Sequence, residues 1–152
     1  MIGIKGIIDC TDFENDFADL KQMTQIGVEK LLFEDKTYKI IGACMTVHKG
    51  LGAGFLESVY HEALEKEFET QKVAFETKKK LMVFYNDKPL NKYFIADFVC
   101  FKKIIIEIKA ATFLHKDTEA QTINYLKSTN YPVGLLINFG QSSLTWKRFI
   151  NT

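Results

Sequence analysis

The stretch Asp97–Lys109, which reads DFVCFKKIIIEIK, decides the fold of this chain. Its second half is a run of isoleucines, 104–106, that Ile108 continues. Such a run is typical of a strand that is buried on both faces. Glu107 and Lys109 interrupt the run, although a buried charge is costly unless it is paired or bound to an ion. Local pattern and local chemistry therefore conflict here, and such conflicts are expected at functional sites.

The pairing of the two halves of this stretch sharpens the conflict. Two lysines in its middle are the only polar break between two apolar runs. If the runs pair antiparallel about a turn near Lys102, Asp97 lies opposite Glu107, and both share one face with Lys109. Opposed carboxylates repel each other, and a divalent cation such as Mg²⁺ removes that repulsion. The alternative is a surface hairpin with solvated charges, against which the isoleucine run counts.

Length and composition favour one soluble domain. A chain of 152 residues can bury a sizeable core, and 47% hydrophobic with 26% charged residues is ordinary for a globular protein. No apolar run approaches the length of a membrane span, and the first residues lack the core of a signal peptide. We therefore expect a cytoplasmic protein. The 3 widely separated cysteines argue against a disulfide framework, a zinc ribbon and a four-cysteine iron–sulfur cluster.

The net charge of +1 is unevenly distributed along the chain. Residues 1–36 carry 4 lysines and 8 acids, a net charge of −4. Residues 72–109 carry 9 lysines and 4 acids, a net charge of +5. The positive segment surrounds the acidic pair, as an anionic substrate would require. The alternative is a solvated, lysine-rich hairpin.

Hydrophobic periodicity predicts helices and strands in a mixed order. Residues 1–22 are acidic with poor periodicity, and we expect a short surface helix or partial disorder there. The remaining elements, by apolar spacing and turn composition, are a helix from about Gln25 or Lys36 to Lys49, a helix over Gly54–Thr70, strands over Val73–Phe75 and Leu81–Tyr85, a turn at Asn86–Pro89, strands over Phe94–Phe101 and Ile104–Ile108, a helix from Asp117 or Thr118 to Lys127, and strands over Val133–Phe139 and Leu144–Ile150. This order predicts an α/β protein, or α+β sandwich, in which helices flank a central mixed sheet.

Two predicted helices carry polar pairs on one side. Glu57 lies in the first turn of its helix, with Tyr60 and His61 at i+3 and i+4. The alternative reading is that Glu57 only complements the helix N-terminus. His61 is read as a surface neighbour rather than a site residue. On the later helix, Gln121 and Tyr125 are spaced i, i+4 and face the same way.

These residues together resemble a known family. The segment Gly54–Tyr60 reads GxxExxY, and an acid, an ExK strand, a QxxxY helix and the strand GLLINFG at 134–140 follow it. The chain, from about Tyr38 to Ile150, resembles the GxxExxY protein family, a branch of the PD-(D/E)XK nuclease superfamily, with the QxxxY helix of its RecB-like branch. The resemblance implies a restriction-endonuclease-like core of order α-β-β-β-α-β-β over residues 36–152. Residues 1–35 would be an N-terminal extension or helix.

The resemblance also implies a metal centre. Asp97 and Glu107 would hold a divalent cation, Mg²⁺ or Mn²⁺, together with the backbone carbonyl of Ile108. Lys109 would orient or activate the attacking water. Glu57 would be a further metal ligand or a base beside the metal.

The helix with the QxxxY motif would support this centre. Gln121 and Tyr125 would brace the site and contact phosphate. One departure from the pattern is Thr118, where many relatives carry a histidine; here His115 lies one helical turn earlier. This substitution leaves the implied metal ligands intact.

The function that follows is a metal-dependent nuclease that hydrolyses phosphodiester bonds of DNA, or of RNA. The alternative is a nucleic-acid-binding or protein-interaction module that keeps the fold with little or no catalysis. A purely structural subunit of a larger complex is a third reading. The short chain leaves little room for a target-recognition domain, which suggests a homodimer, a partner protein or loose sequence specificity.

Overall fold

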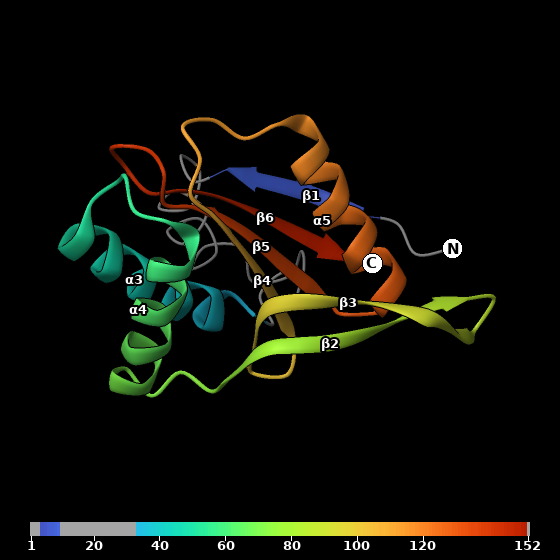
Figure 1. Ribbon diagram of the computed structural model, residues 1–152. Helices are drawn as coiled ribbons and strands as arrows, with labels where there is room; N and C mark the ends of the chain where they lie inside the picture. The colour runs from blue at the N-terminus through green and yellow to red at the C-terminus, as the bar shows by residue number, and fades with distance from the viewer. Residues whose placement is uncertain (1–3, 10–32, 152) are drawn as a thin grey trace, which may run out of the picture.

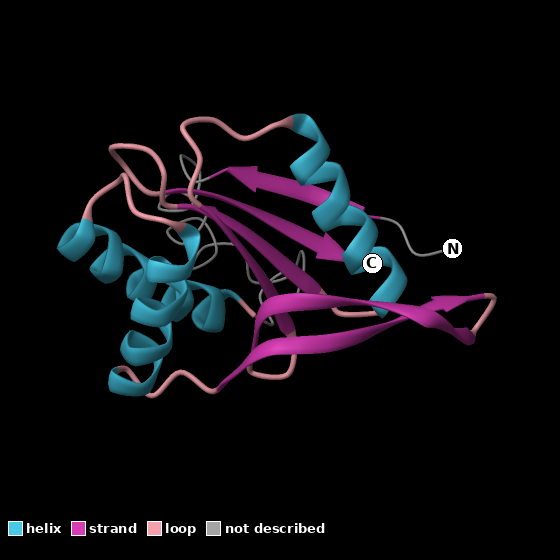
Figure 2. Cartoon of the chain, in the orientation of Figure 1, coloured by secondary structure: helices cyan, strands magenta, loops and turns pink. Residues whose placement is uncertain are grey.

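The computed structural model describes residues 4–9 and 33–151. They form a six-stranded sheet of order β1-β6-β5-β4-β3-β2, in which only the β4–β5 pair is parallel. In chain order the elements are β1 (Ile4–Asp9), α3 (Glu34–Leu51), α4 (Glu57–Thr70), β2 (Phe75–Tyr85), β3 (Lys88–Cys100), β4 (Ile104–Lys109), α5 (Lys116–Thr129), β5 (Val133–Asn138) and β6 (Thr145–Asn151). The predicted class, a mixed sheet with flanking helices, is confirmed (Figures 1 and 2).

The helices divide the core into two layers. α3 and α4 cover one face of the sheet and α5 covers the other (Figure 1). In β4, Ile104, Ile106 and Ile108 pack in the layer under α3 and α4, whereas Ile105 packs in the layer under α5. Burial on both faces, which the isoleucine run predicted, is therefore confirmed. Glu107 and Lys109 alternate with these isoleucines and lie on the α5 side.

The strand β2 is longer than the sequence predicted. Two separate strands were expected because Lys78, Lys79 and Lys80 interrupt the apolar pattern. The structure instead has one continuous strand, Phe75–Tyr85, in which the lysine run is retained. β2 is the outermost strand of the sheet, so these long side chains reach solvent, and edge strands commonly carry lysine. The expected turn is confirmed at Asn86 and Asp87, whose φ angles are 48° and 60°.

The first described residues form an edge strand rather than a surface helix. β1 pairs antiparallel with β6, and its register shifts between Lys5 and Ile7. The physical reason is the unpaired backbone edge of β6, which β1 satisfies with its own N–H and C=O groups. The expectation for residues 10–32 lies outside the described residues. The division of the chain at residue 35 stays a prediction.

Within residues 4–9 and 33–151, no helix is long and apolar enough to span a bilayer. The cytoplasmic location stays a prediction. Cys44 and Cys100 are free thiols in the buried core. Burial raises the pKa of both thiols, so they are poor nucleophiles in this position.

Candidate active site

The β3–β4 hairpin has the predicted register. Its ladder pairs Phe98 with Ile106 and Cys100 with Ile104, so the next position along would oppose Asp97 and Glu107. The ladder ends before that position. There the side chain of Asp97 takes over from the backbone, since its Oδ2 accepts a hydrogen bond from the N–H of Ile108 at 2.9 Å. The carboxylate of Asp97 is therefore held directly against β4.

Both strands of the β2–β3 pair are distorted near Asp97. Phe94 and Ala96 pack in the α5 layer, whereas Phe98 packs in the opposite layer, so the alternation of side chains slips by one residue between them. Lys78, across from Asp97, has a φ of 48°. A positive φ is uncommon for a residue with a side chain, and such strain concentrates at functional sites. The same lysine donates from Nζ to Asp97 Oδ1 at 3.0 Å.

Glu107 is a partly buried acid, and one of its carboxyl oxygens is shielded from solvent. Its Oε1 has no hydrogen-bond partner among the described residues. Burial, and next the negative charge of Asp97, raise the pKa of Glu107 to about 8, while Lys109 acts in the opposite direction. Both causes disfavour the ionised form. A bound cation would supply the positive charge that this pair of carboxyl groups is missing.

The end of β4 is fixed to the end of β5. Asn138 Oδ1 accepts from the N–H of Ala111 at 3.0 Å, and its Nδ2 donates to the C=O of Ala111 at 2.9 Å. Gly140 lies so close to this segment that an added Cβ would be 2.2 Å from the nitrogen of Ala111. The contacts of Asn138 and Gly140 with Ala111 therefore fix the end of the strand that carries Lys109. Lys109 is two residues from Glu107 and lies on the same face.

The GxxExxY segment has a clear structural role on α4. The hydroxyl of Tyr60 donates to the C=O of Gly52 at 2.5 Å and accepts from the N–H of Phe55 at 3.3 Å. Gly54 has a φ of 104°, which a residue with a side chain rarely adopts. The hydroxyl of Tyr60 thus holds the loop before α4, and the positive φ of Gly54 lets this loop turn. As a result α4 begins at Glu57 rather than at Gly54, where the sequence placed its start.

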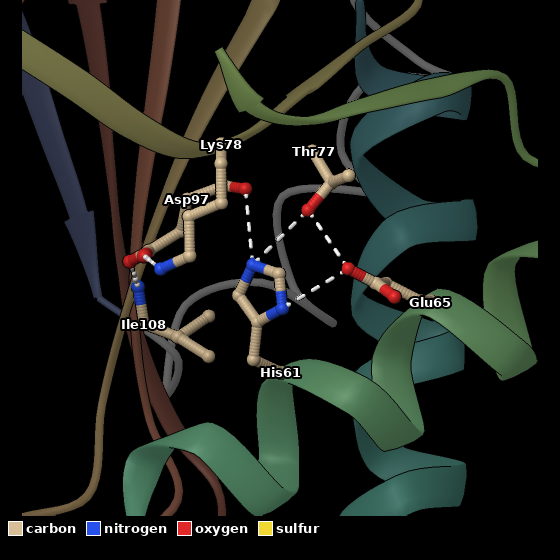
Figure 3. A network of polar contacts seen from close by, with 6 residues as sticks. All are labelled: His61, Glu65, Thr77, Lys78, Asp97 and Ile108. Atoms are coloured by element: carbon tan, nitrogen blue, oxygen red, sulfur yellow. Dashed lines mark hydrogen bonds and ion pairs between the residues drawn. The ribbon is translucent and has the colours of Figure 1, made fainter.

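His61, which the sequence predicted to be a surface neighbour, contacts this site. His61 is buried, its Nε2 lies 3.2 Å from the C=O of Asp97, and its ring stacks on Phe98 with centroids 4.3 Å apart. Its Nδ1 lies 3.2 Å from Glu65 Oε1, which also accepts from Thr77 at 2.8 Å (Figure 3). The sequence signal that could have identified His61 is its i+4 spacing from Glu57, which places both residues on the same side of the helix.

Glu57 lies in the first turn of α4. It lines a groove of about 560 Å³ between α4 and β2, together with His61, Lys78 and other residues of α4. α4 covers the face of the sheet opposite the Glu107 side chain. Among residues 4–9 and 33–151, no three His, Cys, Asp or Glu side chains are grouped closely enough to hold a metal ion. The structure thus brings Asp97 and Glu107 together, and in the described part of the chain they form no three-residue metal cluster with Glu57.

The two residues of the QxxxY helix contact each other and reach the Glu107 side. Gln121 Nε2 donates to the hydroxyl of Tyr125 at 2.7 Å. The ring of Tyr125 stacks on Phe94 with centroids 3.6 Å apart. Burial, and next the charge of Glu107, raise the pKa of Tyr125, so this hydroxyl lies within the electrostatic reach of that carboxyl. His115, in contrast, is exposed at the beginning of α5.

The chain was compared with known protein families. The family model described as the PD-(D/E)XK nuclease superfamily matches residues 34–149. The chain belongs to the PD-(D/E)XK nuclease superfamily. The match spans every candidate site residue named above. No curated protein and no solved structure matched the chain.

The site fits the divalent metal that nucleases of this superfamily generally use. Carboxylate oxygens are the ligands that hard cations prefer. Among the described residues, Glu107 offers a buried oxygen without a hydrogen-bond partner, and burial together with the charge of Asp97 raises the pKa of its carboxyl group. Asp97 already attracts one cationic group, the ammonium of Lys78. The donor set on β3 and β4 therefore matches the chemistry of a superfamily metal centre.

Proposed function

We propose that this chain is a divalent-metal-dependent nuclease that hydrolyses phosphodiester bonds of DNA, with RNA as the second candidate substrate. The observation that carries the proposal is the Asp97–Glu107 pair: Oε1 of Glu107 is buried without a hydrogen-bond partner among the described residues, and the pKa of Glu107 is raised to about 8. Strongly shifted carboxyl groups of this kind concentrate at functional sites. Membership of the superfamily supports the same conclusion.

The metal ligands in this proposal come from two adjacent strands. Asp97 and Glu107 provide carboxylates, and the C=O of Ile108 provides a backbone oxygen, for Mg²⁺ or Mn²⁺. A bound cation of this type lowers the pKa of its water and stabilises negative charge on the phosphate. Glu57, on α4, is the candidate for a further ligand or a base, and it borders the groove that Lys78 also lines.

The remaining side chains act on the substrate and on the water. The ammonium of Lys109 orients the attacking water and stabilises the charge that grows on the phosphate. The hydrogen-bonded pair Gln121–Tyr125 supports the site from α5 and offers hydroxyl and amide groups to a phosphate. The N–H of Ile108 holds Asp97 in one orientation before any substrate arrives, which reduces the cost of reaching the reactive geometry.

Within the superfamily we place the chain in the GxxExxY branch, with a RecB-like QxxxY helix. Support comes from the roles of Gly54 and Tyr60 in the loop before α4 and from the contact between Gln121 and Tyr125. We further propose that residues 36–152 are the nuclease domain and that the protein is cytoplasmic. Because this domain is small, a homodimer or a partner protein would help to select the substrate.

One observation favours a second candidate function. Glu57 is not grouped with the two acids, and no three-residue metal cluster is formed among the described residues. A chain that never assembles such a cluster would be a nucleic-acid-binding or protein-interaction module with a nuclease-like fold and little catalysis. Metal titration separates the two functions.

The test is calorimetric titration of Mn²⁺ and Mg²⁺ into the wild type, Asp97→Ala and Glu107→Ala. Asp35→Ala is the matched control, because Asp35 is an exposed acid in the first turn of α3. The same samples are then incubated with single-stranded DNA, double-stranded DNA and RNA. We expect metal binding and cleavage in the wild type and the control, and the loss of both in the two site variants.

Two other results would change the conclusion. Failure of the wild type to bind either metal would overturn the nuclease proposal and favour the interaction module. Cleavage that persists in Glu107→Ala would show that the reaction takes place elsewhere.

A further inference from the structure

β2 and β3 form a two-stranded arm that reaches beyond the rest of the sheet (Figure 1). The reason is the short pairing of β3 with β4, which covers only residues 98–100 of β3. The part of β2 and β3 that precedes residue 98 of β3 packs against α5 on one face. The helix α4 does not extend over the other face.

The two faces of the arm are chemically different. Leu81 and Phe94 pair across the strands and pack in the α5 layer, and the ring of Tyr125 covers Phe94. The opposite side is what we call the arm face, made of two cross-strand pairs: Lys80 with Ile95, and Met82 with Tyr93. On it, Met82, Tyr93 and Ile95 are 43%, 49% and 52% exposed. Apolar side chains left in the solvent together in this way mark a binding surface.

The charge of the arm shows what kind of ligand this face fits. Residues 78–92 carry 5 lysines and 1 acid, a net charge of +4. The ammonium of Lys80 lies 3.9 Å from the centre of the Tyr93 ring, so charge and apolar surface occupy the same place. A ligand that satisfies both must be anionic and must carry flat apolar surface. A single-stranded nucleic acid has this combination, since its phosphates contact lysines while its bases stack on aromatic rings.

A duplex fits this face less well. Its bases are stacked inside, and it presents mainly phosphates and groove edges to a protein surface. The lysines would still attract it, but Met82, Tyr93 and Ile95 would gain no stacking or apolar contact. The arm face should therefore distinguish unpaired from paired nucleic acid.

The arm face is continuous with the candidate active site. Lys78 precedes Lys80 by two residues on β2, and its Nζ contacts the carboxylate of Asp97. Ile95 precedes Asp97 by two residues on β3. A strand that lies along the arm face thus leads toward Lys78 and the carboxylate of Asp97.

We propose that the arm face binds an unpaired strand of the nucleic-acid substrate and guides it to Asp97, at the edge of the candidate active site. The proposal rests on the proposed nuclease function for the identity of the ligand. It goes beyond that function in assigning a substrate class, nucleic acid with single-stranded segments or ends, and the surface that selects it.

The test measures binding apart from cleavage. The full chain carrying Glu107→Ala, kept in EDTA so that no phosphodiester bond is cut, is titrated into fluorescein-labelled single-stranded DNA, its RNA counterpart and a matched duplex, and anisotropy is recorded. Tyr93→Ala should weaken binding of the single strands about 5- to 150-fold, and binding of the duplex far less, because one stacking contact is lost. Tyr93→Phe should bind normally, because it keeps the ring. Lys80→Gln should reduce the salt slope for single strands by about 0.7.

Tyr38→Ala is the matched control, since Tyr38 is 54% exposed on α3, and it should bind as the parent does. Thermal unfolding checks each variant, and Met82→Gln makes the same test if Tyr93→Ala does not fold. Unchanged affinity of the arm variants for single strands would overturn the proposal. So would equal losses for single strands and duplex, or a wild-type dimer that Tyr93→Ala converts to monomers, which would identify the arm face as a contact between copies of the chain.

The same experiment separates the two proposals. If the wild type with Mn²⁺ cleaves nucleic acid while Tyr93→Ala binds single strands normally, the arm proposal fails and the nuclease stands. If Tyr93-dependent binding of single strands is found but the wild type cleaves none of the substrates, the nuclease proposal fails and the arm remains a binding surface.

Discussion

The backbone N–H of Ile108 donates a hydrogen bond to Asp97 Oδ2 at 2.9 Å. Through this contact a side chain of β3 replaces the backbone pairing of β3 with β4, which ends at Phe98. The bond holds the carboxylate of Asp97 beside Glu107 even though the two groups repel each other. Strand pairing supplies the stability that keeps this unfavourable pair together.

The stability of the metal-free protein should fall as the pH rises. The pKa of Glu107 is raised from 4.5 to about 8. Between these two pH values the folded state holds a proton that the unfolded chain has released, so the free energy of unfolding decreases with rising pH, by at most about 5 kcal/mol. Glu107→Gln should remove this dependence. Urea unfolding in EDTA at several pH values measures it, and identical pH profiles for the two proteins would contradict the expectation.

Lys109→Met should lower the rate of cleavage without preventing metal binding. The substitution keeps the length of the side chain but removes the ammonium that we propose to act on water and phosphate. Loss of one such charge-stabilising group typically lowers kcat about 100- to 1,000-fold. Single-turnover cleavage and calorimetric metal titration measure the two effects. Lys49→Met, at the exposed end of α3, is the control. A variant that cleaves as fast as the control would remove Lys109 from the mechanism.

His61→Phe should weaken metal binding while preserving the fold. Phenylalanine retains the stacking on Phe98 but loses the contact with the C=O of Asp97. Residues that orient metal ligands in this way typically contribute 10- to 100-fold to affinity. Metal titration measures the loss, and His115→Phe is the control, because His115 is exposed. If both variants bind metal as the wild type does, His61 only fills space in the core.

Gly140→Ala should destabilise the protein, whereas Gly50→Ala should not. A Cβ on Gly140 would lie 2.2 Å from the nitrogen of Ala111, so β5 must move away from the segment that follows Lys109. Forcing extra atoms into such a contact costs about 1 to 3 kcal/mol. On Gly50, the corresponding position has no heavy atom of the described residues within 4 Å apart from its own helix. Gly50 lies within α3, where alanine is favoured. Thermal unfolding compares the two, and equal stability would mean that the ends of β4 and β5 shift apart freely.

The pairing of Asp97 with Glu107 was easier to predict from the sequence than the contacts around it. Asp97 and Glu107 are ten residues apart and belong to one hairpin, so strand periodicity alone could align them. Lys78 and His61 contact Asp97 from 19 and 36 residues away, and no local pattern relates such pairs. No local pattern predicts the hydrogen bonds between Asn138 and Ala111 either, because these residues are 27 positions apart. Glu57 was grouped with the acids by resemblance, and its place in the site stays a prediction.

The sequence by itself determined the fold class, the burial of β4 on both faces and the register of the β3–β4 hairpin. These features follow from periodicity and from the spacing of neighbouring residues, and both are local properties. Only the tertiary structure decided that Lys78–Lys80 run through one continuous edge strand, that residues 4–9 add a strand at the opposite edge, and that His61 is buried against Asp97. Each of these depends on which distant segment supplies a hydrogen-bond partner or excludes water, and packing alone decides that.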